Sequence, residues 1–320
     1  MNPAKRDEFK KDEEAPGSVK FYPSIEQFKN AVKQVRDYYS FHGLPLPTLS
    51  FRGTVKCHGT NSGIMRCGDE ITLLARSRIV TPVEDNHGFA AWMHGKSLGG
   101  LIADGQTLYG EFCGGNIQKG VALSQLPKMF IAFGLFDGEN WLPLPAMTPE
   151  LNQMGIWSIE QFPTFTLDID FAHPERSVEA LTKITEAVEA ECPVGAFFGV
   201  HGTGEGVVWR CESRSTLCFK VKGKKHSESK VKTLVPVDVE RLESLNALVS
   251  AILTENRMAK IYAEMGSNVE NTQIGSFLKA CVNDCLKEET DTILASGFEV
   301  KDFTKKAPSV ARDWLFKARI

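Results

Sequence analysis

The feature that most constrains the fold is a change in the period of the hydrophobic residues near Pro236. Before this point apolar residues alternate with polar or small ones, as in residues 49–55. After it they recur every three to four residues, as in 242–252 and 274–282. A period of two is typical of half-buried strands, and a period near 3.6 is typical of amphipathic helices. The sequence therefore predicts a strand-rich N-terminal part and a helical C-terminal part.

The same patterns predict individual elements. Residues 63–67 and 71–75 flank a Gly-Asp-Glu turn and predict a β-hairpin. Near the N-terminus, Ser24 and Gln27 have the spacing of a capping box, ahead of a helix predicted over 24–41. Further strands are expected at 107–112, 130–136, 206–211 and 217–221, and a further helix at 177–191.

These elements indicate an α+β fold with a domain boundary near residues 233–237. We expect residues 1–17 to form a flexible tail, because they mix charges of both signs and contain no apolar stretch. Residues 18–234 would form the strand-rich domain, and residues 235–320 a small domain made only of helices.

Charge and composition exclude some classes of protein. The formal net charge of the 320 residues is −3, so a surface for nucleic acid would have to be local. The charged tail is neither a signal peptide nor a membrane anchor. We expect a cytoplasmic protein with no membrane partner, located in the host cytoplasm if the chain is viral.

The cysteines favour a reducing compartment. Eight of them are scattered without CxxC pairs, and no histidine cluster accompanies them at zinc spacing. Cys281 and Cys285 would share one helix face, where burial as small apolar side chains is favoured over metal binding. No heptad pattern indicates an obligate assembly, so we expect a monomer.

The most informative segment for chemistry is Lys-Cys-His-Gly-Thr-Asn at residues 56–61, where Lys56 ends a predicted strand and a glycine-containing turn follows. Alone, such a lysine is more often a solvated surface cation. A lysine acts as a nucleophile only as a neutral amine, and nearby cations favour that form. Lys220 and Lys222 leave the same face of a predicted strand and could supply these cations, although the spacing fits a solvent-facing edge strand equally well.

Four other side chains are candidates for contacts with a nucleotide. Glu111 and Glu205 lie on strand-like runs and could hold a ribose hydroxyl or a magnesium ion, or be satisfied structural acids. Arg76 has a guanidinium suited to phosphate, with a surface role as the alternative. Phe133 lies in an apolar run, where it could pack in the core or stack on a base.

Taken in order, these segments resemble the motifs of covalent nucleotidyltransferases, the superfamily of ATP- and NAD-dependent ligases and mRNA capping enzymes. His58 stands where DNA ligases and capping enzymes usually carry Asp, and KxHGTN is similar to the RNA ligase 2 family of bacteriophages and trypanosome editing ligases. The resemblance covers about residues 50–232 by motif and the C-terminal part by layout. It continues through residues 76–85, 110–119, 205–208 and 220–228.

This resemblance implies an ATP-grasp-like nucleotidyltransferase domain of antiparallel sheets with flanking helices. It also implies a reaction in three steps. Lys56 would attack the α-phosphate of ATP, the AMP would pass to an RNA 5′-phosphate, and a 3′-hydroxyl would displace the AMP. The RNA partner would be a nicked duplex or a broken structured RNA, and the reaction would serve RNA repair.

Residue roles are implied by position in the same motifs. Lys56 would be the nucleophile, and Lys220 and Lys222 would contact the α-phosphate as catalytic residues. Glu205 and Glu111 would hold Mg²⁺, with Mn²⁺ as the alternative ion. The nucleotide-binding residues would be Val55, His58, Gly59, Asn61, Arg76, Glu111, Phe133, Glu205, Lys220 and Lys222.

Two positions depart from the family pattern. The family often carries an aromatic–Asp pair in the strand after Glu111, whereas Phe133 is followed by glycine and the pair Phe136-Asp137 offers a second alignment. We favour Phe133 as the residue that stacks on adenine. Arg210 replaces a usual lysine and keeps its charge.

Other functions remain open at this point. A DNA ligase or an mRNA guanylyltransferase would use the same lysine chemistry. A non-catalytic RNA-binding relative would use the lysines only for phosphate contacts.

Two basic segments are candidate RNA surfaces. Residues 220–232 carry six lysines and one acid, Glu228, directly after the predicted phosphate-binding strand. Residues 301–319 are also basic. We expect the helical domain to help hold the RNA.

Overall fold

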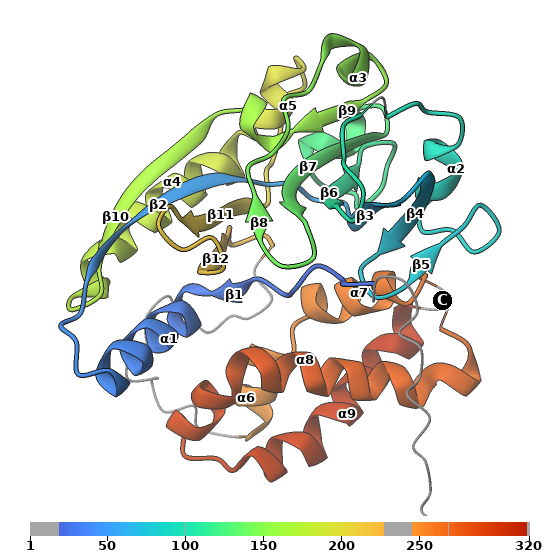
Figure 1. Ribbon diagram of the computed structural model, residues 1–320. Coiled ribbons are helices and arrows are strands. Elements are labelled where there is room, and N and C mark those ends of the chain that lie inside the picture. Colours follow the sequence, from blue (N-terminus) through green and yellow to red (C-terminus); the bar gives the residue numbers. More distant parts are fainter. Residues whose placement is uncertain (1–18, 99, 227–244, 268, 319–320) are drawn as a thin grey trace, which may run out of the picture.

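A computed structural model describes residues 19–98, 100–226, 245–267 and 269–318. Within them the fold is α+β, as predicted: two β-sheets meet in the upper part of Figure 1, and the C-terminal helices gather below them. The predicted tail at 1–17 and the predicted domain boundary at 234–235 lie outside the described residues.

The first sheet positions most of the candidate residues. Its strand order is β1-β12-β11-β2-β10, antiparallel except for the parallel pair β1–β12. The strands are β1 (Glu26–Gln27), β2 (Thr48–Lys56), β10 (Thr164–Asp170), β11 (Gly206–Cys211) and β12 (Cys218–Lys222).

The two faces of this sheet differ because successive side chains point to opposite sides of a strand. Phe51, Trp209 and Phe219 lie on the apolar face and are buried in a core shared with helices α1 (Phe28–Phe41) and α4 (Val178–Ala190). On the other face lie polar side chains, including Arg210 and Lys220, which are only partly buried. The alternation thus leaves a polar surface beside a well-packed core.

The second sheet has the order β5-β4-β3-β6-β7-β8, with β9 parallel to β7. A separate apolar core lies against it, built around Phe89, Phe112 and Phe130. Its strands are β3 (Thr60–Cys67), β4 (Glu70–Ala75), β5 (Ile79–Val80), β6 (Thr107–Cys113), β7 (Met129–Phe136), β8 (Trp141–Leu142) and β9 (Ile156–Ser158). The helices near it are α2 (Phe89–Met93), α3 (Pro149–Gln153) and α5 (Pro193–Phe197).

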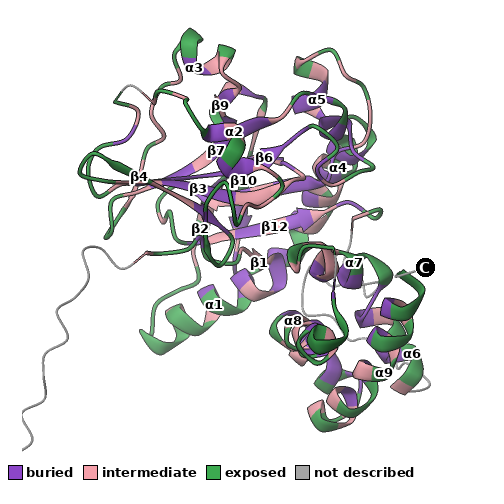
Figure 2. Ribbon diagram, turned by 90° about the vertical axis from the view of Figure 1, so that its right-hand side faces the viewer, coloured by how far each residue is buried: buried purple, intermediate pink, exposed green. Residues whose placement is uncertain are grey.

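The C-terminal helices have an apolar core of their own. They are α6 (Leu245–Ile252), α7 (Glu255–Glu264), α8 (Ile274–Ala295) and α9 (Val300–Ala318). Phe277, Phe303 and Leu315 are fully buried in this core, and Figure 2 shows the helices turning buried residues toward one another. Cys281 and Cys285 also lie in it, so both thiols are buried as predicted. None of the described helices is long and apolar enough to cross a membrane.

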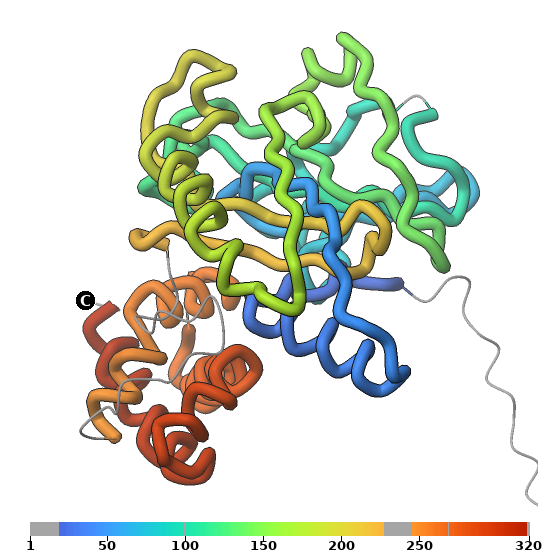
Figure 3. The backbone as a smooth tube through the Cα atoms, turned by 90° about the vertical axis from the view of Figure 1, so that its left-hand side faces the viewer, coloured from blue at the N-terminus to red at the C-terminus, as the bar shows by residue number. Residues whose placement is uncertain are grey.

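The two parts of the chain touch beside α1. In Figure 3 helix α1 lies next to the C-terminal helices, and a buried ion pair joins Lys29 of α1 to Glu289 of α8 at 2.7 Å. The C-terminal helices therefore lie beside the sheets on the side of α1.

The predicted capping box is wrong. Helix α1 begins at Phe28 rather than at residue 24, and its N-cap, Gln27, makes no side-chain capping bond. The reason is that Glu26 and Gln27 pair with Phe219 and Lys220 of β12, which keeps the chain extended up to residue 27. The other predicted strands and the helix at 177–191 are confirmed with ends that differ by at most one residue, except that β3 begins at Thr60, three residues before the predicted start at 63.

Candidate active site

All the predicted site residues lie around one cleft of about 1000 Å³, between the polar face of the first sheet and the near end of the second. Strand β2 of the first sheet ends at Lys56, and a short turn leads into β3 of the second. The predicted residues that line the cleft are Val55, Lys56, His58, Gly59, Asn61, Arg76, Glu111, Phe133, Glu205, Lys220 and Lys222. Residues far apart in the sequence are thus brought together.

The sheet register places two lysines on either side of a glycine. Gly206 of β11 pairs with Lys56 of β2 on one side and with Lys222 of β12 on the other. A Cβ at Gly206 would lie 2.2 Å from the Val221 carbonyl oxygen, so a side chain cannot fit there. The side chain of the preceding residue, Glu205, contacts both lysines.

Glu205 is the centre of the charges in the cleft. Its carboxylate is 2% exposed, and its Oε2 accepts from Lys56 Nζ at 2.7 Å and contacts His58 Nδ1 at 3.0 Å. Its Oε1 lies 3.2 Å from Lys222 Nζ. Burial by itself would raise the pKa of Glu205, but Lys56, Lys222 and His58 outweigh it and hold the pKa well below the ordinary value. Glu205 is therefore ionised and fixes both lysines.

Glu111 is the second carboxylate of the cleft, and it behaves differently. Burial raises its pKa from 4.5 to about 7, against the opposing effect of Lys56, and the nearby Glu205 adds to the rise. Its Oε1 accepts from the backbone N–H of Gly59 at 2.9 Å. A Cβ at Gly59 would lie 2.3 Å from the Phe112 carbonyl oxygen, so only glycine lets the turn approach β6 this closely.

The raised pKa of Glu111 predicts a pH dependence of stability. Its carboxyl ionises near pH 4.5 in the unfolded chain and near 7 in the folded protein, so the folded state binds more protons in between. The contribution of this carboxyl to the free energy of unfolding is therefore largest below the unfolded pKa, and it falls as the pH rises toward the folded pKa. We expect Glu111→Gln to gain about 2 to 3 kcal/mol relative to the wild type between roughly pH 5 and pH 8.

Urea denaturation of both proteins across this pH range measures the difference. Glu179→Gln, which changes an exposed carboxylate in the first turn of α4, is the matched control and should change little with pH. The prediction is contradicted if the difference in free energy of unfolding between Glu111→Gln and the wild type stays constant or decreases as the pH rises.

An aromatic group occupies another part of the cleft. Phe133 lines it, whereas Phe136 is absent from its wall and packs on Trp141 with a centroid distance of 5.0 Å. The Phe133 ring meets Tyr22 edge-on at 4.8 Å. The position of Phe133 favours it for base stacking, which stays a prediction.

Two of the arginines that line the cleft are held by neighbouring hydroxyls. Arg210 Nη2 donates to the Tyr22 hydroxyl at 3.0 Å, and Arg76 Nη2 donates to Ser24 Oγ at 2.8 Å. Both groups keep a positive charge at the cleft surface, where they suit contacts with phosphate.

The cations around Lys56 do not form an isolated positive cluster. Lys222 shares the Glu205 carboxylate with Lys56, and Lys220 Nζ lies 3.0 Å from Glu288 Oε1 of α8. Cations and carboxylates therefore alternate along the cleft. That Lys220 and Lys222 keep the Lys56 amine neutral stays a prediction.

Sequence reasoning missed several residues of the cleft wall. Tyr22 and His226 line the cleft, as do Asn256 and Lys260 of α7. The His226 ring meets the His58 ring at 5.2 Å, and burial followed by the charge of His58 lowers its pKa. His226 lies in the basic run that follows β12, which is a weak signal. Nothing in the helical periodicity of α7 indicated that it reaches the cleft.

The predicted basic surfaces are only partly described. Residues 227–232 lie outside the described residues, whereas Lys225 lines the cleft and Lys224 pairs with Glu186 at 2.7 Å. On α9, Lys305, Lys306 and Arg312 are exposed. Their contact with RNA stays a prediction.

The residues present suit a metal ion that is completed by phosphate. Among the described residues no group of three His, Cys, Asp or Glu side chains could hold a metal by itself. Glu111 and Glu205 nevertheless place two carboxylates in one cleft. Mg²⁺ is commonly bound by one or two carboxylates together with substrate phosphates, and this donor set fits that pattern.

Comparisons with known proteins show the family of the chain. A strand-end lysine paired with a buried carboxylate, in a cleft between two sheets, is consistent with the nucleotidyltransferase class that the family match supports. The sequence profile of the RNA ligase family matches residues 50–224, more than half of the chain. The protein belongs to the RNA ligase family. No curated protein matches the chain.

Among solved structures, the chain is similar to RNA ligase from Naegleria gruberi. A lysine-to-alanine mutant with ATP and Mn aligns at 18% identity and a TM-score of 0.43, over 63% of this chain and 56% of that one. The structure of the same ligase with PPi aligns at 17% identity and a TM-score of 0.42, over 68% of this chain and 62% of that one. The chain therefore spans less than two thirds of the length of these proteins.

Proposed function

We propose that the protein is an ATP-dependent RNA ligase that joins a 3′-hydroxyl and a 5′-phosphate of RNA. In the first step Lys56 Nζ loses its proton and attacks the α-phosphorus of ATP. The N–P bond forms while the bond to the β-phosphate breaks, and pyrophosphate leaves with the electron pair. The AMP then passes to the RNA 5′-phosphate, and the 3′-hydroxyl displaces it to form the phosphodiester.

The observation that carries this proposal is the contact between Lys56 and Glu205. A buried carboxylate, ionised and fixed from both sides, holds the lysine amine at the end of β2 within the cleft. Phosphoryl transfer depends mainly on position and charge, because the transition state spreads negative charge over oxygen atoms. The paired lysines of β2 and β12 supply both requirements.

Other side chains of the cleft fit the remaining parts of ATP. Phe133 offers a ring for adenine, and Arg76 offers a guanidinium for ribose or phosphate. A divalent cation, Mg²⁺ or Mn²⁺, held by Glu205 and Glu111 would neutralise charge on the departing pyrophosphate. Glu205 would still orient Lys56 through the same carboxylate.

RNA is favoured as the polymer by the family and by His58. The His58 ring nitrogen contacts the carboxylate that holds the nucleophile, so the residue that distinguishes the RNA ligase motif lies at the reaction centre. A nicked duplex or a broken structured RNA would be the substrate, and sealing it would serve RNA repair. We further propose that the protein acts as a monomer in the cytoplasm, and that its domains divide near residues 234–235.

Labelling with nucleotides tests this proposal. Purified protein incubated with ATP or GTP carrying ³²P at the α-phosphate, with Mg²⁺ or Mn²⁺, should retain label on a denaturing gel from ATP. Adding a duplex with a 5′-phosphate RNA nick should then release the label and give sealed product. Label from GTP alone would support a guanylyltransferase instead, and sealing of DNA nicks without RNA nicks would support a DNA ligase.

A further inference from the structure

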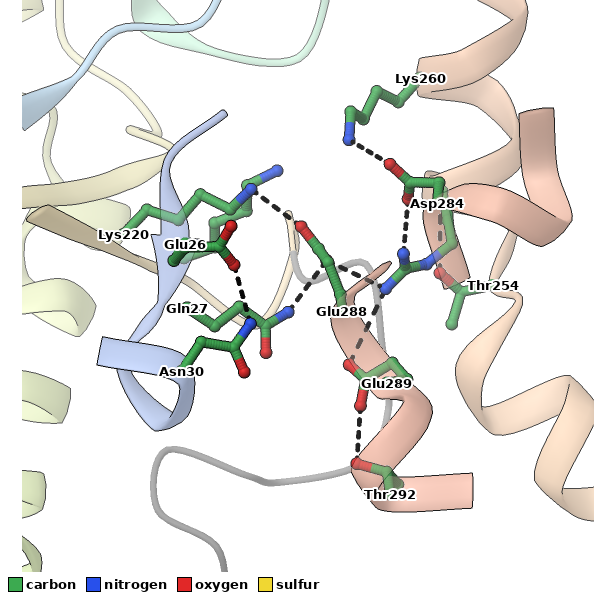
Figure 4. Close-up of polar contacts among 12 residues, drawn as sticks. Glu26, Gln27, Asn30, Lys220, Thr254, Lys260, Asp284, Glu288, Glu289 and Thr292 are labelled. Atoms are coloured by element: carbon green, nitrogen blue, oxygen red, sulfur yellow. Dashed lines mark hydrogen bonds and ion pairs between the residues drawn. The ribbon is translucent and has the colours of Figure 1, made fainter. Parts of the chain in front are cut away.

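A lysine of the cleft is held by the C-terminal helices. Lys220 Nζ lies 3.0 Å from Glu288 Oε1 of α8, and the two side chains are 13% and 8% exposed. Gln27 Nε2 donates to the other oxygen of Glu288 at 3.0 Å. Figure 4 shows the Glu288 carboxylate reaching from α8 toward Lys220 and Gln27. One carboxylate thus ties β12 and the end of β1 to the C-terminal helices.

This contact belongs to a continuous network of charges. Arg257 of α7 is fully buried, and its Nη2 lies 3.3 Å from Glu288 Oε2 and 3.9 Å from Glu289 Oε1. Glu289 in turn pairs with Lys29 of α1 at 2.7 Å, where both side chains are almost fully buried. The charge on Lys220 is therefore part of what holds α7 and α8 against the sheets.

The C-terminal helices also form one wall of the cleft. Asn256, Lys260 and Glu264 of α7 line the same cleft as Lys56. A nucleotide in the cleft would thus lie beside α7, and a phosphate on Lys220 would lie beside the Glu288 carboxylate. Two anions that contact the same lysine ammonium repel each other, and the repulsion is stronger where the groups are buried away from water.

We infer that Glu288 makes nucleotide binding and docking of the C-terminal helices compete for Lys220. The inference rests on the proposed function, because it takes the phosphate on Lys220 to belong to ATP. In the empty protein Glu288 holds Lys220 and keeps α7 on the cleft. A nucleotide phosphate that takes Lys220 displaces Glu288, and release of α7 and α8 opens the cleft to a polynucleotide end.

Reciprocity between the two events gives a first test. If docking opposes nucleotide binding through Glu288, removing the charge of Glu288 should tighten nucleotide binding by up to the coupling factor between the two events. Glu288→Gln keeps the size of the side chain and removes only its charge. We expect it to bind α,β-methylene ATP, which Lys56 cannot cleave, about tenfold more tightly in titration calorimetry, within the usual range of coupling energies.

A matched control comes from the same interface. Asp291 of α8 pairs with Lys33 at 3.3 Å, and both side chains are more than half exposed and lie away from the cleft. Asp291→Asn should leave the affinity within about twofold, because exposed ion pairs contribute little. Glu288→Gln binding that is unchanged or weaker overturns the inference, since Glu288 would then not oppose the nucleotide.

A second test uses the wild-type protein and so does not depend on how a variant folds. Saturating α,β-methylene ATP should increase the radius of gyration in small-angle X-ray scattering, because the C-terminal helices move away from the sheets. An unchanged radius at saturation overturns the inference while leaving the proposed function intact. Failure of the wild-type protein to bind the analogue at all would instead refute the proposed function, and the inference with it.

Discussion

Replacing Lys56 with alanine should abolish transfer of AMP to the protein and lower RNA sealing by roughly a thousandfold or more. The amine of Lys56 is the only atom of that side chain that can form the bond to phosphorus, and it is fixed by Glu205 at 2.7 Å. Retention of ³²P by the protein after incubation with labelled ATP measures the first step. Appearance of the longer, sealed RNA strand on a denaturing gel measures the whole reaction.

Two further variants separate chemistry from stability. Lys56→Arg keeps a cation beside Glu205, but the guanidinium is not nucleophilic, so we expect folded protein without label. Lys183→Ala, on the exposed surface of α4, should label like the wild type. If Lys56→Arg retained the label, Lys56 would not be the nucleophile. A pre-adenylated RNA offered to Lys56→Ala should still be sealed, because only the first two steps need the lysine.

Replacing Arg257 with methionine should destabilise the protein by about 3 kcal/mol or more. Arg257 is fully buried, and its guanidinium contacts Asp284, Glu288 and Glu289. Without the guanidinium, the carboxylates of Asp284, Glu288 and Glu289 would lose one cationic partner each. These three like charges would then lie close together on α8. Breaking a buried ion pair from one side is costly because the remaining charge stays away from water.

Urea denaturation followed by circular dichroism measures this loss. Lys260→Met, one turn further along α7, is the matched control: Lys260 is 30% exposed and lies 3.3 Å from Asp284, so we expect a change of less than about 1 kcal/mol. Adding Asp284→Asn to Arg257→Met should restore part of the loss, because it removes one of the like charges. The prediction would be contradicted if the urea concentration at the unfolding midpoint of Arg257→Met were no lower than that of Lys260→Met.

The sequence by itself determined the class of fold and several of the residues that line the cleft. Short alternating or apolar runs predicted β2, β3, β4, β6, β7, β11 and β12, because such patterns are local properties of a strand. The motif residues were also predicted, and all of them line one cleft. Spacing placed Lys220 and Lys222 on one face of a strand, since this too depends only on backbone geometry.

Only the tertiary structure decided how these residues interact. Glu205 and Lys56 are far apart in the sequence, and their contact follows from the register of β11 between β2 and β12. The start of α1 was mispredicted because pairing with β12, a long-range contact, overrode the local capping signal.

The partner of Lys220 is the clearest case. Local sequence predicted a cation for the cleft, but Glu288 lies in a helix 68 residues away, and no local pattern links the two. Docking of α8 beside β12 brings that carboxylate to the lysine. A side chain's type is encoded locally, whereas its charge environment depends on which distant elements pack around it.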